Sequence, residues 1–353
     1  MVSVQIDFHF YAIYALARAG GFMPDDAFTI GYASQHTDDA KYKRALEFKN
    51  GGRFQQVLTA HRFFELEALG KETCYRVWIP FHFLPGNLGV EFYERMVTRA
   101  GSTVAQRLID DLLSSNSKPY LLHRLGIFLH CYADTWSHQN FLGLQRGDLN
   151  DVIELEIRNL PYASFKQQLQ KLQEGFFEYL APKLGHAQAG TIPDEPYREW
   201  KYDNYLGKRF SISNVERSLE AAENCYQVML KFLGQFPGFS QNKPMPWDKI
   251  SGKTRRLFET DANLEDRVKA WKDAISAGDF VLKAEGRDAN LDYDDRKWFR
   301  EAVKVHEPQE GDPEFKWKPG FESSDWKYFQ DAGTLHRFIV LHEVLPEYGM
   351  ICG

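Results

Sequence analysis

LLHRLGIFLHCYADTWSHQNF, residues 121–141, is the stretch that decides the fold. Its apolar residues recur at intervals of three and four, which predicts a long buried helix. His130, Asp134 and His138 follow one another at intervals of four residues. Four residues advance an α-helix by about 6 Å and about 40°, so these side chains form a column on one face. The outer histidines lie about 12 Å apart along the axis, too far to share one ion, whereas a central carboxylate can bridge two. The stretch therefore predicts a multinuclear metal site.

A ladder of buried hydrogen bonds is the alternative interpretation of the same column. Unpaired burial of three polar side chains among residues such as Leu125 and Trp136 would be costly. Shared metal ions satisfy these groups, and so does a hydrogen-bonded ladder. The column by itself leaves both interpretations open.

Apolar positions at helical spacing continue through most of the chain while strand signals are scarce, which predicts an all-α protein. The segments expected to be helical are residues 5–18, a helix opening at Pro24, and residues 54–68, 89–99, 162–183, 213–236 and 325–345. Two prolines and a glycine predict a loop between Trp78 and Asn87, which places His82 on irregular backbone. A second loop is expected over residues 184–205.

The length of 353 residues allows one large domain or two. We expect one multi-helix domain over residues 1–240. A linker over residues 237–246 leads into a charged helical extension, residues 241–353, which we expect to pack on the core. Aromatic residues make up 15% of the chain, which favours aromatic-rich cores and pockets.

The charge and cysteine content narrow the class of protein. A net charge of -6 argues against a broad nucleic-acid surface, which needs clustered Lys and Arg. The four cysteines show no CxxC spacing, which favours a reducing compartment over a disulfide scaffold. No basic leader with an apolar stretch is visible at the N-terminus, and no run reaches the roughly 18 apolar residues that span a bilayer. We expect a soluble, cytoplasmic protein, with leaderless export left open and no prediction of oligomeric state.

Further candidate ligands have aromatic residues, glycine or proline as their neighbours in the sequence. They are His9, His82 and His186. Each alone is more typical of a structural histidine, and the joint pattern favours metal binding. Adjacent carboxylates at a helix end, such as Asp38 and Asp39, are most often solvated caps or surface charges. Asp194 is as typical of an Asx turn next to proline as of a ligand.

The column, preceded by Leu125-Gly126 and followed by Gln139-Asn140-Phe141, resembles the zinc-dependent phospholipase C and fungal zinc nuclease superfamily. The resemblance extends through IDFHFYAIYALARAGG, GYASQHTDDA, WIPFHFLPG and GHAQAGTIPDEPY, over about the first 205 residues, and is to an uncharacterised bacterial branch. Members of this superfamily are all-α and usually hold three zinc ions in a cleft. The resemblance thus implies a multi-helix phospholipase C/nuclease-like domain.

The resemblance also implies a role for each candidate in the first half of the site. His9 would be the N-terminal imidazole ligand. Asp38 or Asp39 would be the early aspartate, which binds metal and can act as base. His82 would follow it, and His130 would complete one zinc site.

In the second half of the site Asp134 would bridge, and His138 with His186 and Asp194 would hold another zinc ion. The chain departs from the family pattern in three ways. It lacks the N-terminal tryptophan that provides ligands in the best-known members, a role in which Asp7 would substitute. Three residues, not five, separate the aspartate from the second histidine of the motif. The last histidine and acid are eight positions apart rather than one helical turn.

The implied activity is hydrolysis of a phosphate ester or phosphodiester by a zinc-bound hydroxide, with Asp38 and Asp134 as catalytic residues and two or three zinc ions as cofactor. The expected partner is a small phosphorylated substrate or a lipid headgroup. The alternative is a non-catalytic or toxin-like interaction protein that keeps the helical shell and a structural metal. No Glu-x-x-His and no HExxH occurs, which argues against a di-iron oxidase and a metalloprotease.

Overall fold

The computed structural model describes residues 6–61, 69–115, 118–160, 164, 183–281, 283–308 and 312–353. The helix expected over residues 162–183 lies, apart from residues 164 and 183, outside this part of the chain.

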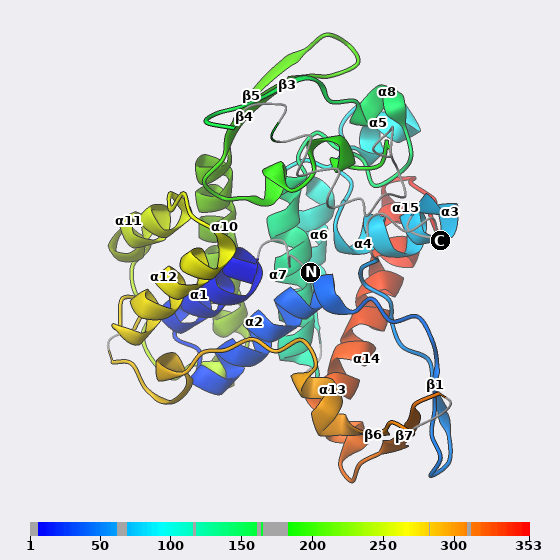
Figure 1. Cartoon of the computed structure of the whole chain (residues 1–353), viewed down its shortest axis with the longest axis vertical. Coiled ribbons are helices and arrows are strands. Elements are labelled where there is room, and N and C mark those ends of the chain that lie inside the picture. Colours follow the sequence, from blue (N-terminus) through cyan, green and yellow to red (C-terminus); the bar gives the residue numbers. More distant parts are fainter. Residues whose placement is uncertain are drawn as a thin grey trace.

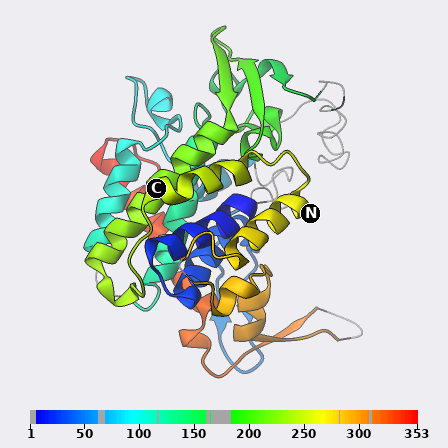
Figure 2. The same cartoon turned by 90° about the vertical axis from the view of Figure 1, so that its left-hand side faces the viewer.

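The protein is a mixed helical and stranded fold, so the all-α prediction is wrong. About 55% of it is helical and 11% is strand. The described strands form three small antiparallel sheets: β1 (Leu46–Glu47) with β2 (Arg53–Phe54); β3 (Ile153–Ile157), β4 (Glu199–Asp203) and β5 (Arg209–Ser213); and β6 (Val303–His306) with β7 (Glu314–Trp317). None of these strands exceeds five residues, so the alternation of buried and exposed side chains that indicates a strand covers only a few positions. In β4 the buried positions are Trp200 and Tyr202. Figures 1 and 2 show the β3–β5 sheet and the β6–β7 hairpin at opposite ends of the molecule.

Helices make up most of the remainder (Figure 1). The longer ones are α1 (Ile13–Gly20), α2 (Pro24–Asp39), α6 (Thr103–Ser114), α7 (Leu121–Ser137), α10 (Asn214–Gln235), α11 (Trp247–Phe258), α12 (Leu264–Ser276) and α14 (Asp325–Phe338). Short ones are α3 (Lys71–Thr73), α4 (Ile79–Phe81), α5 (Phe92–Met96), α8 (Gly147–Asn150), α13 (Lys297–Ala302) and α15 (Leu345–Glu347). Three are π-helical, η1 (Asp7–Ala12), η3 (Cys74–Trp78) and η9 (Ile339–Val344), and the 3-10 turns include η4 (Ala187–Ala189), η5 (Ile192–Asp194), η6 (Pro237–Phe239), η7 (Gly286–Ala289) and η8 (Phe321–Ser323).

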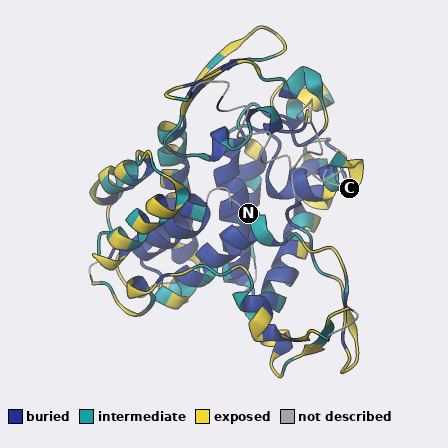
Figure 3. Ribbon diagram, viewed as in Figure 1, coloured by how far each residue is buried: buried dark blue, intermediate teal, exposed yellow. Residues whose placement is uncertain are grey.

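The long helix α7 lies at the centre, and nearly all of its residues are buried (Figure 3). It packs against α2, α10 and α14, so its sides are covered by other helices. The helix ends at Ser137, earlier than the predicted run toward Phe141. The chain turns there because Asn140 adopts a positive φ of 79°, a conformation that asparagine tolerates better than most residues.

Several other expected elements are confirmed and others are wrong. The helix opening at Pro24 and the helix over residues 213–236 are confirmed as α2 and α10. The helix predicted over residues 54–68 is wrong for residues 55–61, which follow β2 without helical structure. The loop predicted from Trp78 is helical as far as Phe81, because proline is tolerated in the first turn of a helix. His82 follows directly, with a φ of −131°.

Residues beyond 240 share the core of the residues before them. Trp271, Trp298 and Phe329 are buried in the same hydrophobic cluster as α7. Asp288 accepts a hydrogen bond from the Tyr14 hydroxyl at 2.7 Å and pairs with Arg18 at 2.9 Å. The C-terminal part of the chain is therefore anchored to the first helices, and the domain boundary at residue 240 stays a prediction. In the described part of the chain, the longest apolar helical windows fall short of what a bilayer crossing requires.

Gly126 sets how closely α7 approaches α2. A Cβ atom at this position would lie 2.4 Å from the backbone oxygen of Ile30 and 2.7 Å from the Cβ of Ala33. Backbone cannot yield as a flexible side chain can, so only glycine permits this contact. Asp38 follows on α2, and His130 and Asp134 follow on α7, so the contact also sets their separation.

We expect Gly126→Ala to lower the free energy of unfolding by about 1–3 kcal/mol, because the added methyl group forces the two helices apart. Gly234→Ala is the matched control, since the same addition on α10 meets nothing within 4 Å. It should leave stability unchanged or raise it by up to about 1 kcal/mol. Urea unfolding followed by circular dichroism measures both, and equal midpoints for the two variants would contradict the proposed contact.

Candidate metal centre

The structure gathers eight of the nine sequence-predicted ligands into three groups, in each of which the candidate ligand atoms lie within 4.8 Å of one another. The groups are His9, Asp38 and His130; His82, His130 and Asp134; and His138, His186 and Asp194. His9 comes from η1, Asp38 from α2, His82 from the end of α4, His130 and Asp134 from α7, His138 from the residue after α7, His186 from the residue before η4 and Asp194 from η5. Segments far apart in the sequence thus converge beside α7.

Asp134 stands at the centre of this convergence, with only 2% of its surface exposed. Its Oδ1 lies 3.3 Å from Nε2 of His9. Its Oδ2 lies 3.1 Å from Nδ1 of His82 and 3.3 Å from Nε2 of His130. The two carboxylate oxygens therefore face different histidines, which is the arrangement that a bridging carboxylate needs.

A backbone carbonyl orients His82. Its Nε2 lies 2.9 Å from the carbonyl oxygen of Thr59, which can only accept a hydrogen bond. In the neutral ring the proton is then on Nε2, and the lone pair of Nδ1 points toward Asp134 and toward Nε2 of His130, 3.2 Å away. A ligand histidine in a metal site is typically held in this way.

The third group is oriented in the same manner. Nδ1 of His138 donates to the carbonyl oxygen of His82 at 2.8 Å, and Nδ1 of His186 donates to that of Gly190 at 3.0 Å. The Nε2 atoms of the two rings then face Asp194, at 3.3 Å and 3.7 Å from its carboxylate oxygens. With both rings neutral, the group therefore presents two imidazole lone pairs and one carboxylate.

The two ring nitrogens of His138 face different groups. The ring nitrogen nearest to Asp134 is Nδ1, at 3.7 Å, and it is already engaged by the His82 carbonyl. The other nitrogen faces Asp194. The reason is that His138 is the first residue after α7 and its backbone is not helical, so its side chain does not continue the column of His130 and Asp134.

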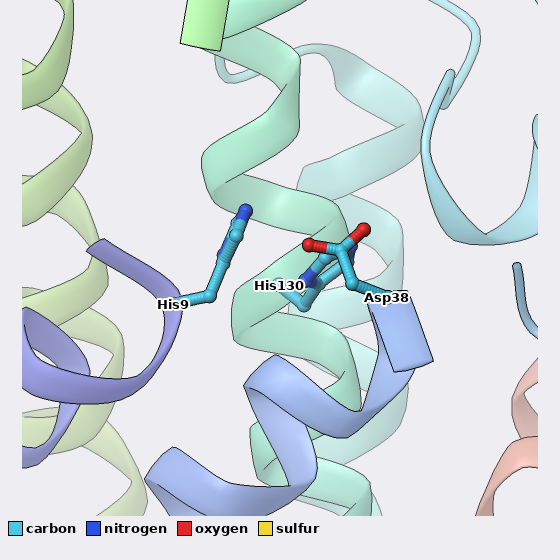
Figure 4. Close-up of side chains that lie close together, drawn as sticks. All are labelled: His9, Asp38 and His130. Atoms are coloured by element: carbon cyan, nitrogen blue, oxygen red, sulfur yellow. The ribbon is translucent and has the colours of Figure 1, made fainter. Parts of the chain in front are cut away.

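The remaining group consists of His9, Asp38 and His130 (Figure 4). The rings of His9 and His130 lie with centroids 4.0 Å apart, and Oδ1 of Asp38 lies 3.9 Å from Nε2 of His130. The Asp38 side chain is 27% exposed, whereas those of His9 and His130 are almost fully buried. Water and small solutes can therefore approach the centre at Asp38.

Two polar atoms of this group are unsatisfied. The Nδ1 atoms of His9 and His130 are buried and have no hydrogen-bond partner in the part of the chain that the structure describes. A buried ring nitrogen without a partner costs free energy whether or not it is protonated. An ordered water would remove that cost. The Nε2 atoms of both rings face the Asp134 carboxylate, and this combination of imidazole and carboxylate donors fits a metal centre.

The histidine pKa values diverge around Asp134. Burial lowers the pKa of His9, but the Asp134 carboxylate outweighs burial and leaves it above the usual range. Burial also opposes protonation of His138, yet Asp134 and Asp194 raise its pKa to about 9. Burial, followed by the nearby His9, lowers the pKa of His130 to about 3. Without ions, the carboxylates therefore favour the protonated forms of His9 and His138.

The two aspartates of the centre shift in opposite directions. Burial raises the pKa of Asp134, but the neighbouring His138 and His130 outweigh it and hold this pKa well below the usual value. Burial raises the pKa of Asp38 to about 6. Asp134 is thus an ionised carboxylate, and metal cations would replace the protons that now balance it.

Two other candidates lie outside the groups. Asp39 accepts hydrogen bonds from the Tyr293 hydroxyl at 2.7 Å and from Gln35 at 3.1 Å, so of the two adjacent acids it is Asp38 that joins the ligand groups. Asp7 accepts from Nε of Arg267 at 2.7 Å and is not a member of any group.

Sequence reasoning missed the backbone carbonyls that orient the histidines. The carbonyls of Thr59 and Gly190 have no sequence signal, because every residue carries one and only the folded chain brings these two to the rings. Gly190 itself has a positive φ of 57°.

Comparison with known proteins gives a family and no activity. No curated protein and no solved structure matches the chain. Nothing in the comparisons links it to the phospholipase C and zinc nuclease superfamily, so that resemblance stays a prediction. One family model matches residues 4–344, nearly the whole chain. The chain therefore belongs to DUF6765, a family of unknown function.

Proposed function

We propose that this protein is a multinuclear zinc hydrolase that acts on a phosphate ester or phosphodiester. The observation that carries the proposal is the convergence of eight His and Asp residues, from separate segments, into three groups beside α7. Mixed imidazole and carboxylate ligands are typical of zinc sites. Catalytic zinc sites keep a position open to solvent, and the exposure of Asp38 supports one here.

The ligand groups favour at least two ions. One would be held by His82, His130 and Asp134, and a second by His138, His186 and Asp194. The group of His9 and Asp38 shares His130 with the first ion, and one imidazole nitrogen ligates one ion. A third ion would therefore depend on Oδ1 of Asp134, which faces His9 at 3.3 Å.

Bound zinc would lower the pKa of a coordinated water toward neutrality and stabilise negative charge on phosphoryl oxygens. The chain's own contribution is proton handling and orientation. Asp38, with a pKa of about 6 and access to solvent, is ionised enough near neutral pH to accept a proton from water. Asp134 remains ionised and holds the ligand histidines in place.

The second candidate function is a non-catalytic interaction protein with a structural metal. The depth of the centre favours it, since His130 is 0% exposed and Asp134 only 2%. Structural zinc sites are closed, whereas catalytic ones are open. A panel of phosphomonoesters and phosphodiesters, assayed on the zinc-loaded protein, separates the two functions. Turnover supports the hydrolase, and complete inactivity at full zinc occupancy supports the structural role.

We expect the untagged protein to carry at least two zinc ions per chain and Asp134→Asn to lose at least one, because the variant removes the carboxylate shared by the histidines. Zinc is measured by elemental analysis after gel filtration. Asp288→Asn is the control, because it also removes a buried carboxylate but one that pairs with Arg18. It should lower stability and leave the zinc content unchanged.

A wild-type chain without stoichiometric metal would contradict the proposal. Equal zinc in wild type and Asp134→Asn would instead contradict the role of Asp134. Since zinc binds the folded state, it should also raise the unfolding temperature of the wild type in a concentration-dependent manner.

Two adjacent acids provide a second test. Asp38→Asn should lower hydrolysis at least about 100-fold, because it removes both a ligand and the proton acceptor. Asp39→Asn should keep hydrolysis within about threefold, since its partners are Tyr293 and Gln35. The measurement is kcat/KM for the best substrate of the panel. The assignment fails if Asp39→Asn is the more damaging of the two.

A further inference from the structure

A cavity opens beside the third ligand group. Asp194 is part of its wall, and its empty volume, including the opening to solvent, is about 320 Å³. The lining includes the apolar residues Phe8 and Pro193 and the hydrogen-bond donors Trp136 and Arg217. A molecule in this cavity would therefore lie against Asp194, one of the proposed zinc ligands.

Arg217 is a cation without a matching anion. Nη1 donates to the carbonyl oxygen of Ser137 at 3.3 Å, and among the described residues no carboxylate lies within ion-pair distance of the guanidinium. Burial lowers its pKa to about 10, which leaves it protonated at neutral pH. A partly buried guanidinium normally pairs with a carboxylate or a phosphate, whose geometry it matches with two parallel hydrogen bonds.

Two further features of the cavity favour an anion. The indole Nε1 of Trp136 is buried and has no hydrogen-bond partner within the described chain, although Trp136 is only 3% exposed. The cavity also lies at the first turn of α10, where the Ser213 side chain makes no capping hydrogen bond. The N-terminus of a helix carries a partial positive charge and attracts anions.

We propose that this cavity binds the phosphoryl group of the substrate through Arg217, with Trp136 as a second donor. The inference rests on the proposed function, because it places the phosphoryl group next to the ligand group of Asp194. The apolar wall of Phe8 and Pro193 would contact the organic part of an ester. Arg217 is a substrate-binding residue in this proposal and takes no part in proton transfer.

We expect Arg217→Gln to weaken binding of inorganic phosphate to the zinc-loaded protein about 10- to 100-fold, because it removes a charge-assisted hydrogen-bond pair. Lys231→Gln is the matched control. It removes the same charge from the exposed side of α10 and should bind phosphate as the wild type does. Isothermal titration calorimetry measures affinity, and zinc content is determined on the same samples.

Equal phosphate affinity in wild type and Arg217→Gln at unchanged zinc content would overturn this inference and leave the hydrolase proposal standing. Absence of zinc from the wild type would instead defeat the hydrolase proposal. Phosphate binding to the zinc-free protein then tests the inference. If the zinc-free wild type binds phosphate and Arg217→Gln does not, the anion site is supported. If the zinc-free wild type does not bind phosphate, the inference is overturned. Acetate that binds as tightly as phosphate would overturn the phosphoryl assignment.

Two conservative variants keep the test decisive if Arg217→Gln does not fold. Arg217→Lys retains the charge but loses the paired hydrogen bonds, so an intermediate affinity is expected. Trp136→Phe keeps the ring and removes the indole donor, for which we expect a loss of about three- to tenfold. Wild-type affinity in both folded variants would overturn the inference.

Discussion

Asp134 is a negative charge buried on the central helix, and the surrounding structure is organised to compensate it. A buried carboxylate is tolerated only when cations or hydrogen-bond donors surround it. Here η1 contributes His9, the end of α4 contributes His82, and α7 itself contributes His130 one turn earlier. The convergence of these segments is thus an electrostatic requirement as well as a consequence of packing. Protons can meet that requirement, and metal cations meet it with a stronger charge at the same positions.

The rigidity of the centre comes from the fold around it. Gly126 lets α7 lie against the backbone of α2, so Asp38 approaches His130 from a fixed direction. The carbonyls of Thr59 and Gly190 hold two rings in the tautomer that turns a lone pair inward. Ligand histidines oriented by backbone lose little entropy when an ion binds. A buried hydrogen-bonded ladder is the alternative to metal. Such a ladder is incomplete among the described residues, because the Nδ1 atoms of His9 and His130 have no hydrogen-bond partner there.

The local charge around the centre differs from the charge of the whole chain. The net charge is -6, yet the cavity beside Asp194 lies at a helix N-terminus and is lined by Arg217, whose guanidinium has no carboxylate partner among the described residues. Two or three zinc ions would add to that positive potential. An acidic protein can therefore present an anion-attracting cavity, since the field at a site depends on the groups within a few ångströms and less on distant, screened charges.

The sequence by itself determined the helices α2 and α10, the buried helix α7 and the nine candidate ligands, because periodicity, proline position and residue type are local properties. Only the tertiary structure decided that Asp38 and not Asp39 joins the groups, and that short strands form three sheets among the described residues. These outcomes depend on contacts between residues far apart in the chain. Adjacent aspartates are chemically identical until a neighbour such as Tyr293 engages one of them, and a helical column ends where the backbone leaves the helix.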